Sequence, residues 1–514
     1  MRTLFWSVIA LVLLLSLTSL AFYGGEEEVV AEKPSEAVTQ MVGELRAQVD
    51  LLTEDFGKLE ELIALSIAAA NSPYGQRWIV EAENLQVSLQ NRVANSVSSL
   101  ERRILSSNPP VGVAKQVQEF MGRAHDCLAI ESHIAVTIAK HSVGLDVPQS
   151  EWMALADMYA GVKNTYQRNM GLKALSARLV AINPAASSEI AVRLDAPFVK
   201  MLYRIEQTTI SADEILQSGL DDFLKLQLLV ALGKHQSAQV VSRAAVQLVT
   251  ACKDAKEQAF CAARVLTQLP GIPAAQRNAL IALVEQGDAL LVASTKIAIG
   301  DDAALENIPQ QYPRERLLAS SIKKSTQASL NSLIEAAEEI TSVTLRDEVL
   351  LHIATNKSPL SDDDFALLID SMEDSYVQLV AKLDRLKKAP MAPDAATKYL
   401  MSLEAFAESV KESQPLIDLT VAWGCVDPYM ARQTLTRFDT PSRVQAAVAL
   451  SAVLTEEAQV SRILADVREE VSRTTTFEPV EKSTLLRQIA GAVQAVDTDE
   501  NLAILEEAYR AVVQ

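Results

Sequence analysis

Apolar residues recur at alternate steps of four and three between Ser35 and Ala70, and this spacing fixes the secondary structure of the segment. Such steps keep the apolar side chains on one face of an α-helix, whereas a half-buried strand alternates at every second residue. The seam consists of Val38, Val42, Leu45, Val49, Leu52, Phe56, Leu59 and Ile63. The spacing therefore predicts one long helix that packs against another helix over almost four heptads.

A second long helix is predicted from Trp78 to Leu105, after a break at residues 71–75 that contains Pro and Gly. Its apolar residues follow the same steps, except that one step departs from the heptad. Two long helices joined by a short loop favour an antiparallel hairpin. Self-association of two chains through the first helix is the alternative use of the same seam.

The composition of the chain favours helices outside these two segments as well. Gly and Pro number 17 and 18, and aromatic residues are 5% of the chain, which is too few for an all-β protein and unfavourable for a doubly wound α/β enzyme. A hydrophobic fraction of 49% excludes a disordered chain. Further long helices are predicted at 113–143 and at 151–182, the latter kinked near Gly171. Residues 35–183 then form a bundle, and the whole chain is all-α.

Residues 185–514 contain shorter helices with frequent starts and stops, at one helix per ~20 residues. A phrase that begins with Arg and continues with Leu, Ile and Ala recurs in this region. It stands at 277–283, 314–322, 346–354 and 443–450, with a related piece at 485–490. These phrases resemble degenerate tetratricopeptide or HEAT-type repeats. The resemblance implies an α-solenoid of helical hairpins, without the full tetratricopeptide signature.

The N-terminus predicts export or anchoring. Residues 4–23 are an uncharged apolar run that is long enough to span a membrane, preceded by Arg2 and followed by acidic residues. Residues 1–25 are therefore expected to be a single transmembrane anchor, or a signal peptide cleaved after Ala21, with 26–34 as a linker. The bulk of the chain would lie in the cell envelope outside the cytoplasmic membrane, or be periplasmic or secreted after cleavage.

Few residues belong to a pattern that indicates metal binding, a disulfide or catalysis. His125, His133 and His141 share one predicted helix, but steps of eight residues keep any two of them from one metal ion. Cys252 and Cys261 could form a disulfide if a tight turn falls between them. Motifs for phosphate loops, nucleophilic serines and zinc proteases are absent from the sequence. We therefore expect no metal, no cofactor and no enzymatic activity.

The formal charge of −19 excludes nucleic acid as a main partner, because phosphate binding needs clustered Lys and Arg. The leading hypothesis is a membrane-anchored or exported helical-repeat scaffold that binds protein partners in the envelope. An extracytoplasmic sensor or ligand-binding bundle is one alternative, and an enzyme built on an α-solenoid or α-toroid is another.

Overall fold

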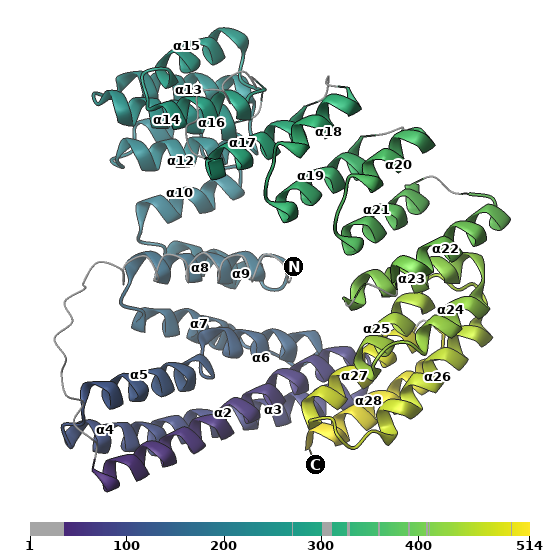
Figure 1. The fold of residues 1–514 in the computed structure, drawn as a ribbon. Helices are drawn as coiled ribbons and strands as arrows, with labels where there is room; N and C mark the ends of the chain where they lie inside the picture. Colours follow the sequence, from purple (N-terminus) through teal and green to yellow (C-terminus); the bar gives the residue numbers. More distant parts are fainter. Residues whose placement is uncertain are drawn as a thin grey trace. The chain divides into compact units, whose positions relative to one another are not determined.

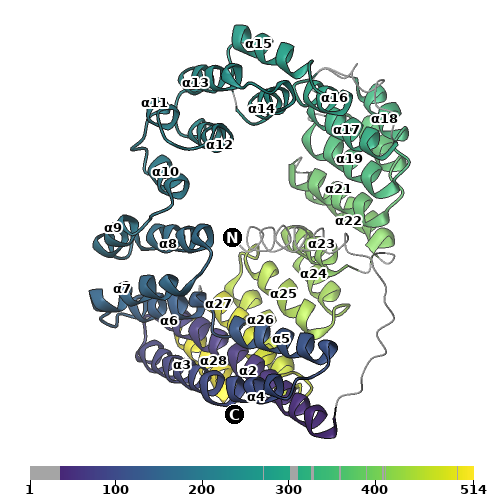
Figure 2. The ribbon, with the colours of Figure 1, turned by 90° about the vertical axis from the view of Figure 1, so that its left-hand side faces the viewer.

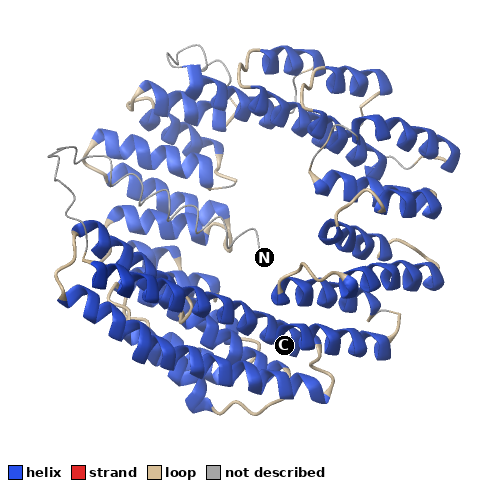
Figure 3. Cartoon of the chain, turned by 60° about the horizontal axis from the view of Figure 1, so that its bottom comes forward, coloured by secondary structure: helices blue, strands red, loops and turns tan. Residues whose placement is uncertain are grey.

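Helices are the regular elements of the described residues, and no strand occurs among them (Figures 1 and 3). The computed structural model describes residues 35–269, 271–300, 311–325, 329–357, 360–388, 391–407, 410, 412–494 and 496–513. The all-α prediction is confirmed for these residues. The apolar run at 4–23 and the linker at 26–34 lie outside them. Within the described part, no helix combines the length and the apolar character that crossing a membrane requires.

The chain divides into two compact units. The first consists of residues up to Gly57 together with Asn84–Ala129, and the second of Lys58–Glu83 together with Ile130–Gln514. The long helices α2 (Glu36–Ala68) and α3 (Pro73–Arg92) each contribute residues to both units. Three more helical segments complete the first unit, namely η1 (Val93–Val97), α4 (Ser98–Ser106) and α5 (Val111–Asp126).

The predicted seam on α2 is buried inside the chain. Val38, Leu45, Val49, Leu52, Leu59 and Ile63 are all at most 8% exposed, and Val42 and Phe56 are half-buried. The predicted second helix is also present. The structure thus shows the helices packed within one chain, and self-association through the seam would require these contacts to open.

The step that departs from the heptad has a structural counterpart in η1. Leu89, Val93 and Val97 follow one another at steps of four and are all buried. Residues 93–97 form a single π-helical turn, which holds more residues per turn than an α-helix. The wider turn keeps these side chains on the buried face despite the extra residue.

The second unit is a succession of short helices. They are α6 (Ile130–Ser142), α7 (Gln149–Met158), η2 (Tyr159–Gly161), α8 (Thr165–Leu179), α9 (Pro184–Val192), α10 (Pro197–Glu206), α11 (Ala212–Leu216), α12 (Asp222–Leu232), α13 (Ala238–Ala251), α14 (Ala255–Gln268), α15 (Ala274–Val284) and α16 (Ala289–Ala298). They continue as α17 (Gln311–Lys324), α18 (Leu330–Glu338), α19 (Val343–Asn356), α20 (Asp362–Asp370), α21 (Ser375–Lys388), α22 (Pro393–Ala407), α23 (Ser413–Val426), α24 (Pro428–Leu435), α25 (Thr440–Ser451), α26 (Glu457–Arg473), α27 (Pro479–Val493) and α28 (Thr498–Val513).

Two predicted helices are broken in the structure. The helix expected at 113–143 is interrupted at residues 127–129, and the helix expected at 151–182 is interrupted at 159–164 rather than kinked at Gly171. Gly171 instead lets the ring of Tyr159 pack directly against the backbone of α8. A Cβ at position 171 would lie 2.0 Å from Cε1 of Tyr159. One buried core contains residues from Ile134 to Val199. It therefore includes residues on both sides of the boundary near residue 184 that was predicted between the bundle and the solenoid.

Neighbouring helices in the second unit pack in overlapping pairs. A helix contacts the next one and also the one after it, as α23 does with α24 and α25, and α14 with α15 and α16 (Figure 2). This is the packing pattern of an α-solenoid, in which each pair buries its apolar face against its neighbours. The architecture expected from the Arg-containing phrases is therefore present.

A recurring contact links each of three helices to the helix two places further along. A buried polar side chain accepts hydrogen bonds from backbone N–H groups at the start of the later helix. The acceptors are Asn169 for Asp195 and Ala196 (2.8 and 3.0 Å), Glu315 for Thr341 (2.8 Å), and Asp347 for Glu373 and Asp374 (3.2 and 2.7 Å). Each acceptor follows an arginine, and two of these arginines begin the repeated phrase.

Side chains cap several of the helix starts. Ser211 and Glu214 form a capping box at the start of α11, and Ser361 caps α20 through the backbone N–H of Asp364 without the reciprocal contact. Asp221 accepts a hydrogen bond from the first turn of α12. The acidic pair at 221–222 is thus part of a helix start.

The tip of the α2–α3 hairpin, residues 58–83, contacts both the first and the last helices of the second unit. Gln76 donates to the carbonyl of Val143 just after α6 (3.1 Å), and Lys140 of α6 pairs with Glu83 (3.0 Å). Tyr509 of α28 donates a hydrogen bond to Glu81. The beginning and the end of the helical array therefore share one hairpin.

A buried carboxylate anchors the C-terminal side of this junction. Glu61 is 5% exposed, and Arg487 of α27 binds both of its oxygens (3.0 and 3.2 Å). Ser483 and Thr484 donate to the same carboxylate at 3.2 and 3.1 Å. A buried charge needs such a set of donors, because burial without partners costs several kcal/mol.

An aromatic stack also joins the hairpin tip to α28. Trp78 is 1% exposed and stacks on Tyr509, with ring centroids 4.8 Å apart, and Tyr74 stacks on Trp78 at 5.6 Å. Burial, with the hydrogen bond to Glu81 as a smaller cause, raises the pKa of Tyr509 to about 12. The junction thus combines a desolvated ion pair with a large apolar contact.

Replacing Arg487 by Met should open the junction locally, because the buried Glu61 would lose its cationic partner. We expect a loss of about 3 kcal/mol in the opening free energy of residues 58–83 and 479–513. Hydrogen exchange read by mass spectrometry measures it segment by segment. Arg510→Met removes only an exposed pair with Glu506 and should cost about 0.5 kcal/mol. Equal protection losses in the two variants would contradict the assignment.

The raised pKa of Tyr509 predicts an alkaline weakening of the junction. Its neutral phenol is favoured in the folded state, so the stabilisation is complete below the ordinary pKa of about 10. It is lost as pH rises from 10 to about 12. Spectrophotometric titration of the native protein and of Tyr509→Phe should differ by one tyrosine that ionises near pH 12. A difference centred near pH 10 would refute this prediction.

Candidate interaction groove

The residues singled out in the sequence for chemistry do not assemble into a reactive centre. His125 and His141 are exposed at the ends of α5 and α6, and His141 lies edge-on to Trp152 with ring centroids 6.3 Å apart. Burial lowers the pKa of the half-buried His133. Among the described residues, no three His, Cys, Asp or Glu side chains form a group that could hold a metal ion.

The turn required for a Cys252–Cys261 bridge does exist, since α13 ends at Ala251 and α14 begins at Ala255. Both cysteines are nevertheless free thiols, so the disulfide that the spacing allows is not formed in the structure. Burial raises the pKa of the Cys261 thiol to about 11. A thiol with so high a pKa is a poor nucleophile near neutral pH.

A groove between α24 and α26 offers a binding surface instead. Two adjoining cavities of about 240 and 410 Å³ share Arg432 and Ile463, and together they follow the two helices. The buried side chains of Leu435, Ile463 and Val467 form its floor. At one end Tyr429 presents its ring to solvent with 69% exposure. A continuous groove with an apolar floor suits a side-chain-bearing segment of another molecule.

Arginines dominate the polar lining of the groove. Arg432 of α24 forms an ion pair with Asp466 of α26. Arg443 of α25 pairs with Glu470 and also donates to the carbonyls of Leu435 and Phe438 at the end of α24 (2.9 and 2.7 Å). These pairs neutralise both carboxylates of the lining and hold the three helices together.

Arg462 is the exception in this lining. It is exposed, lines the wider cavity, and pairs with none of the described residues. With Asp466 and Glu470 each matched by an arginine, it leaves the groove with one cation in excess. This positive excess is local, because the chain as a whole carries a net charge of −19.

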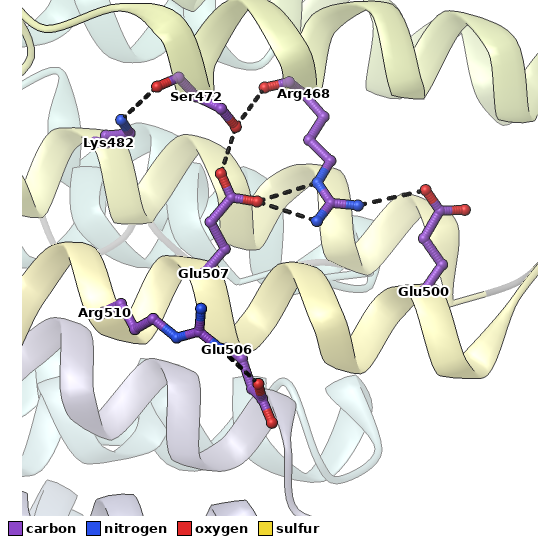
Figure 4. Close-up of polar contacts among 7 residues, drawn as sticks. All are labelled: Arg468, Ser472, Lys482, Glu500, Glu506, Glu507 and Arg510. Carbon is purple, nitrogen blue, oxygen red and sulfur yellow. Dashed lines mark hydrogen bonds and ion pairs between the residues drawn. The ribbon is translucent and has the colours of Figure 1, made fainter.

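The opposite face of α26 is fixed by a polar network. Arg468 follows Asp466 by two residues, so its side chain points away from the groove. It binds Glu507 of α28 with two nitrogens (both 3.1 Å) and Glu500 at 3.5 Å (Figure 4). Ser472 donates to the other oxygen of Glu507. This network orients α26, and with it one wall of the groove.

Comparison with known proteins adds little to this picture. No protein-family model and no curated protein matches the sequence. Among solved structures, the chain is similar to a "Circular tandem repeat protein with novel repeat topology and enhanced subunit contact surfaces". The identity is 14%, over 91% of this chain and 96% of that chain, with a TM-score of 0.13. A similarity of this size does not establish a common fold.

The sequence contains only faint signals of the groove. Pro428 and Asp427 mark a helix start, and Arg443 begins one of the repeated phrases, but periodicity gives no reason to single out Tyr429 or Arg462. Periodicity also gives no reason to single out the buried acceptors Asn169, Glu315 and Asp347. Their signal is a polar residue directly after an arginine inside an otherwise apolar phrase.

The thiol environments predict a clear order of alkylation. Iodoacetamide at roughly pH 8 should label the exposed Cys425 in the native protein, while Cys261 reacts only after denaturation. Peptide mass mapping after timed quenching measures the order. Isolation of a Cys252–Cys261 disulfide from protein purified without reductant would contradict this prediction and restore the bridge.

Proposed function

We propose that the protein is a non-catalytic helical-repeat scaffold that binds an acidic, extended segment of a partner protein in the groove between α24 and α26. The observation that carries the proposal is the combination of a continuous apolar floor, the exposed ring of Tyr429 and the unpaired guanidinium of Arg462. Solenoids present such grooves because parallel helix surfaces repeat along the array. Aromatic and arginine side chains are the residue types that contribute most to protein interfaces.

The lining supports binding rather than turnover. The described residues along the groove include no histidine and no cysteine, and their carboxylates are paired with arginines. Such pairs fix geometry and charge and leave no evident general base. The mechanism we propose is therefore recognition by shape and charge.

We further propose that the N-terminal apolar run holds this scaffold in the cell envelope, as a single-pass anchor or as an export signal. The support is the sequence of residues 4–23 with its flanking charges. Partners would then be envelope proteins.

A photo-crosslinking amino acid at position 429 tests the groove in cells that express the full-length protein. We expect it to capture a protein partner, and we expect Arg462→Glu to reduce that capture by roughly tenfold, since it reverses the unpaired charge. Arg243→Glu is a matched control, because Arg243 is an exposed arginine of α13 that pairs with no described residue.

The same crosslinker at Tyr166 of α8, which is 54% exposed, controls for contacts made by any exposed ring. Capture at position 166 equal to that at 429, or capture insensitive to Arg462→Glu, would rule out the groove as the binding site. Recovery of the protein itself as the captured partner would redirect the proposal towards self-assembly.

A further inference from the structure

A second cavity lies where the last turn of α16 meets α14, α15 and α17. Its volume is about 500 Å³, within the range of about 300–1,000 Å³ that is usual for small-ligand sites. Leu266, Leu269, Ile272 and Ile299 supply its apolar wall, and Arg277 and Lys324 supply its cations. Gly271 and Gly300, with φ of +69° and +96°, turn the chain at its edge.

Arg277 and Lys324 both line this cavity, although they are 47 residues apart in sequence. Arg277 donates from Nη2 to the carbonyl of Ile299 (2.7 Å), and Nζ of Lys324 donates to the carbonyl of Ala298 (3.3 Å). The C-terminus of α16 carries partial negative charge, which favours cations at this point. The fold therefore fixes both positive groups at the rim of one cavity.

Neither cation is paired with a carboxylate in the part of the chain that the structure describes. Arg277 and Lys324 are exposed, and neither forms an ion pair with a described residue. Their neighbours on the same stretch of chain behave differently, since Arg314 pairs with Glu339 and Lys323 with Glu348. A guanidinium has five N–H donors and an ammonium three, so each group keeps donors that no carbonyl uses.

The cavity occurs where the apolar core is thin. One large core ends near Val284, and the next begins at Leu318. Between them only Ala293 and Ile297 form a small buried cluster among the described residues, with Leu317 packed against it. Leu266 and Leu269 belong to the first core, at 7% and 4% exposure, and the half-buried Ile272 and Ile299 pack against it. The apolar wall of the cavity is therefore the edge of that core.

We propose that this cavity is a binding site for a carboxylate that carries an apolar group. The carboxylate would lie between Arg277 and Lys324, and the apolar group against Leu266, Leu269, Ile272 and Ile299. Charge-assisted hydrogen bonds from two cations recognise the carboxylate, and burial of the apolar group adds affinity. A free organic acid and the C-terminal residue of a peptide chain both present this chemistry. The site is separate from the groove between α24 and α26 and does not depend on it.

Isothermal titration calorimetry on the full-length protein tests the proposal. The probes are phenylbutyrate and its neutral amide, and a short peptide ending in leucine with a free or an amidated C-terminus. We expect at least one of the two acids to bind, and the matching amide to bind roughly tenfold more weakly or not at all. The acid that binds identifies the source of the carboxylate.

Arg277→Gln combined with Lys324→Gln should abolish that binding, whereas Arg243→Gln combined with Lys256→Gln should leave it unchanged. The control pair removes two exposed cations of α13 and α14 that pair with no described residue. Because Arg277 also caps α16, Arg277→Lys provides a variant that keeps the charge and should retain most of the affinity. Thermal unfolding of each variant verifies that it is folded.

Three results would overturn the proposal. They are failure of both acids to bind the native protein, binding of the amides as tight as that of the acids, and binding unaffected by the Arg277 and Lys324 substitutions.

Discussion

A single buried carboxylate determines how the two ends of the helical array meet. Glu61 is removed from water, and an isolated charge there would be strongly unfavourable. Arg487, Ser483 and Thr484 satisfy it only if α27 lies directly on the hairpin tip. Once α27 is fixed, α28 brings Tyr509 onto Trp78, and the Arg468 network then sets α26. Lys482 of α27 also donates to the carbonyl of Ser472 on α26 (2.8 Å), so the wall of the proposed groove lies next to the helix that Glu61 holds.

The two proposed sites follow from the same electrostatic situation. In a chain of net charge −19, most of the arginines and lysines described above are paired with carboxylates, often between one helix and the next. Arg462, Arg277 and Lys324 pair with no described carboxylate, as Arg243 and Lys256 do not, and these three line cavities. An unpaired cation on an acidic protein sits in a field that attracts cations rather than anions. Its affinity for an anionic ligand must therefore come from short-range contacts, which makes shape as important as charge.

Local patterns in the sequence predict the local structure well. The four-three spacing identifies α2 and the packing of its seam, and Ser211 with Glu214 marks the start of α11. The break at residues 127–129 gives no such signal, because no Pro or Gly stands there and periodicity continues while the chain turns. Glu61 cannot be singled out from the neighbouring acidic residues of α2, because its burial depends on helices more than 400 residues away. The same reason applies to Tyr429 and Arg277, whose surroundings are assembled by tertiary packing.

The hairpin junction has a consequence for synthesis. Its contacts join residues that are 422 to 428 positions apart. At roughly 5–20 residues per second, Glu61 and Trp78 emerge from the ribosome about 20 to 90 s before α27 and α28 exist. During that interval the tip presents a charged group and a tryptophan that have no permanent partner. The ion pair between Glu61 and Arg487 can therefore form only after almost the whole chain has been synthesised.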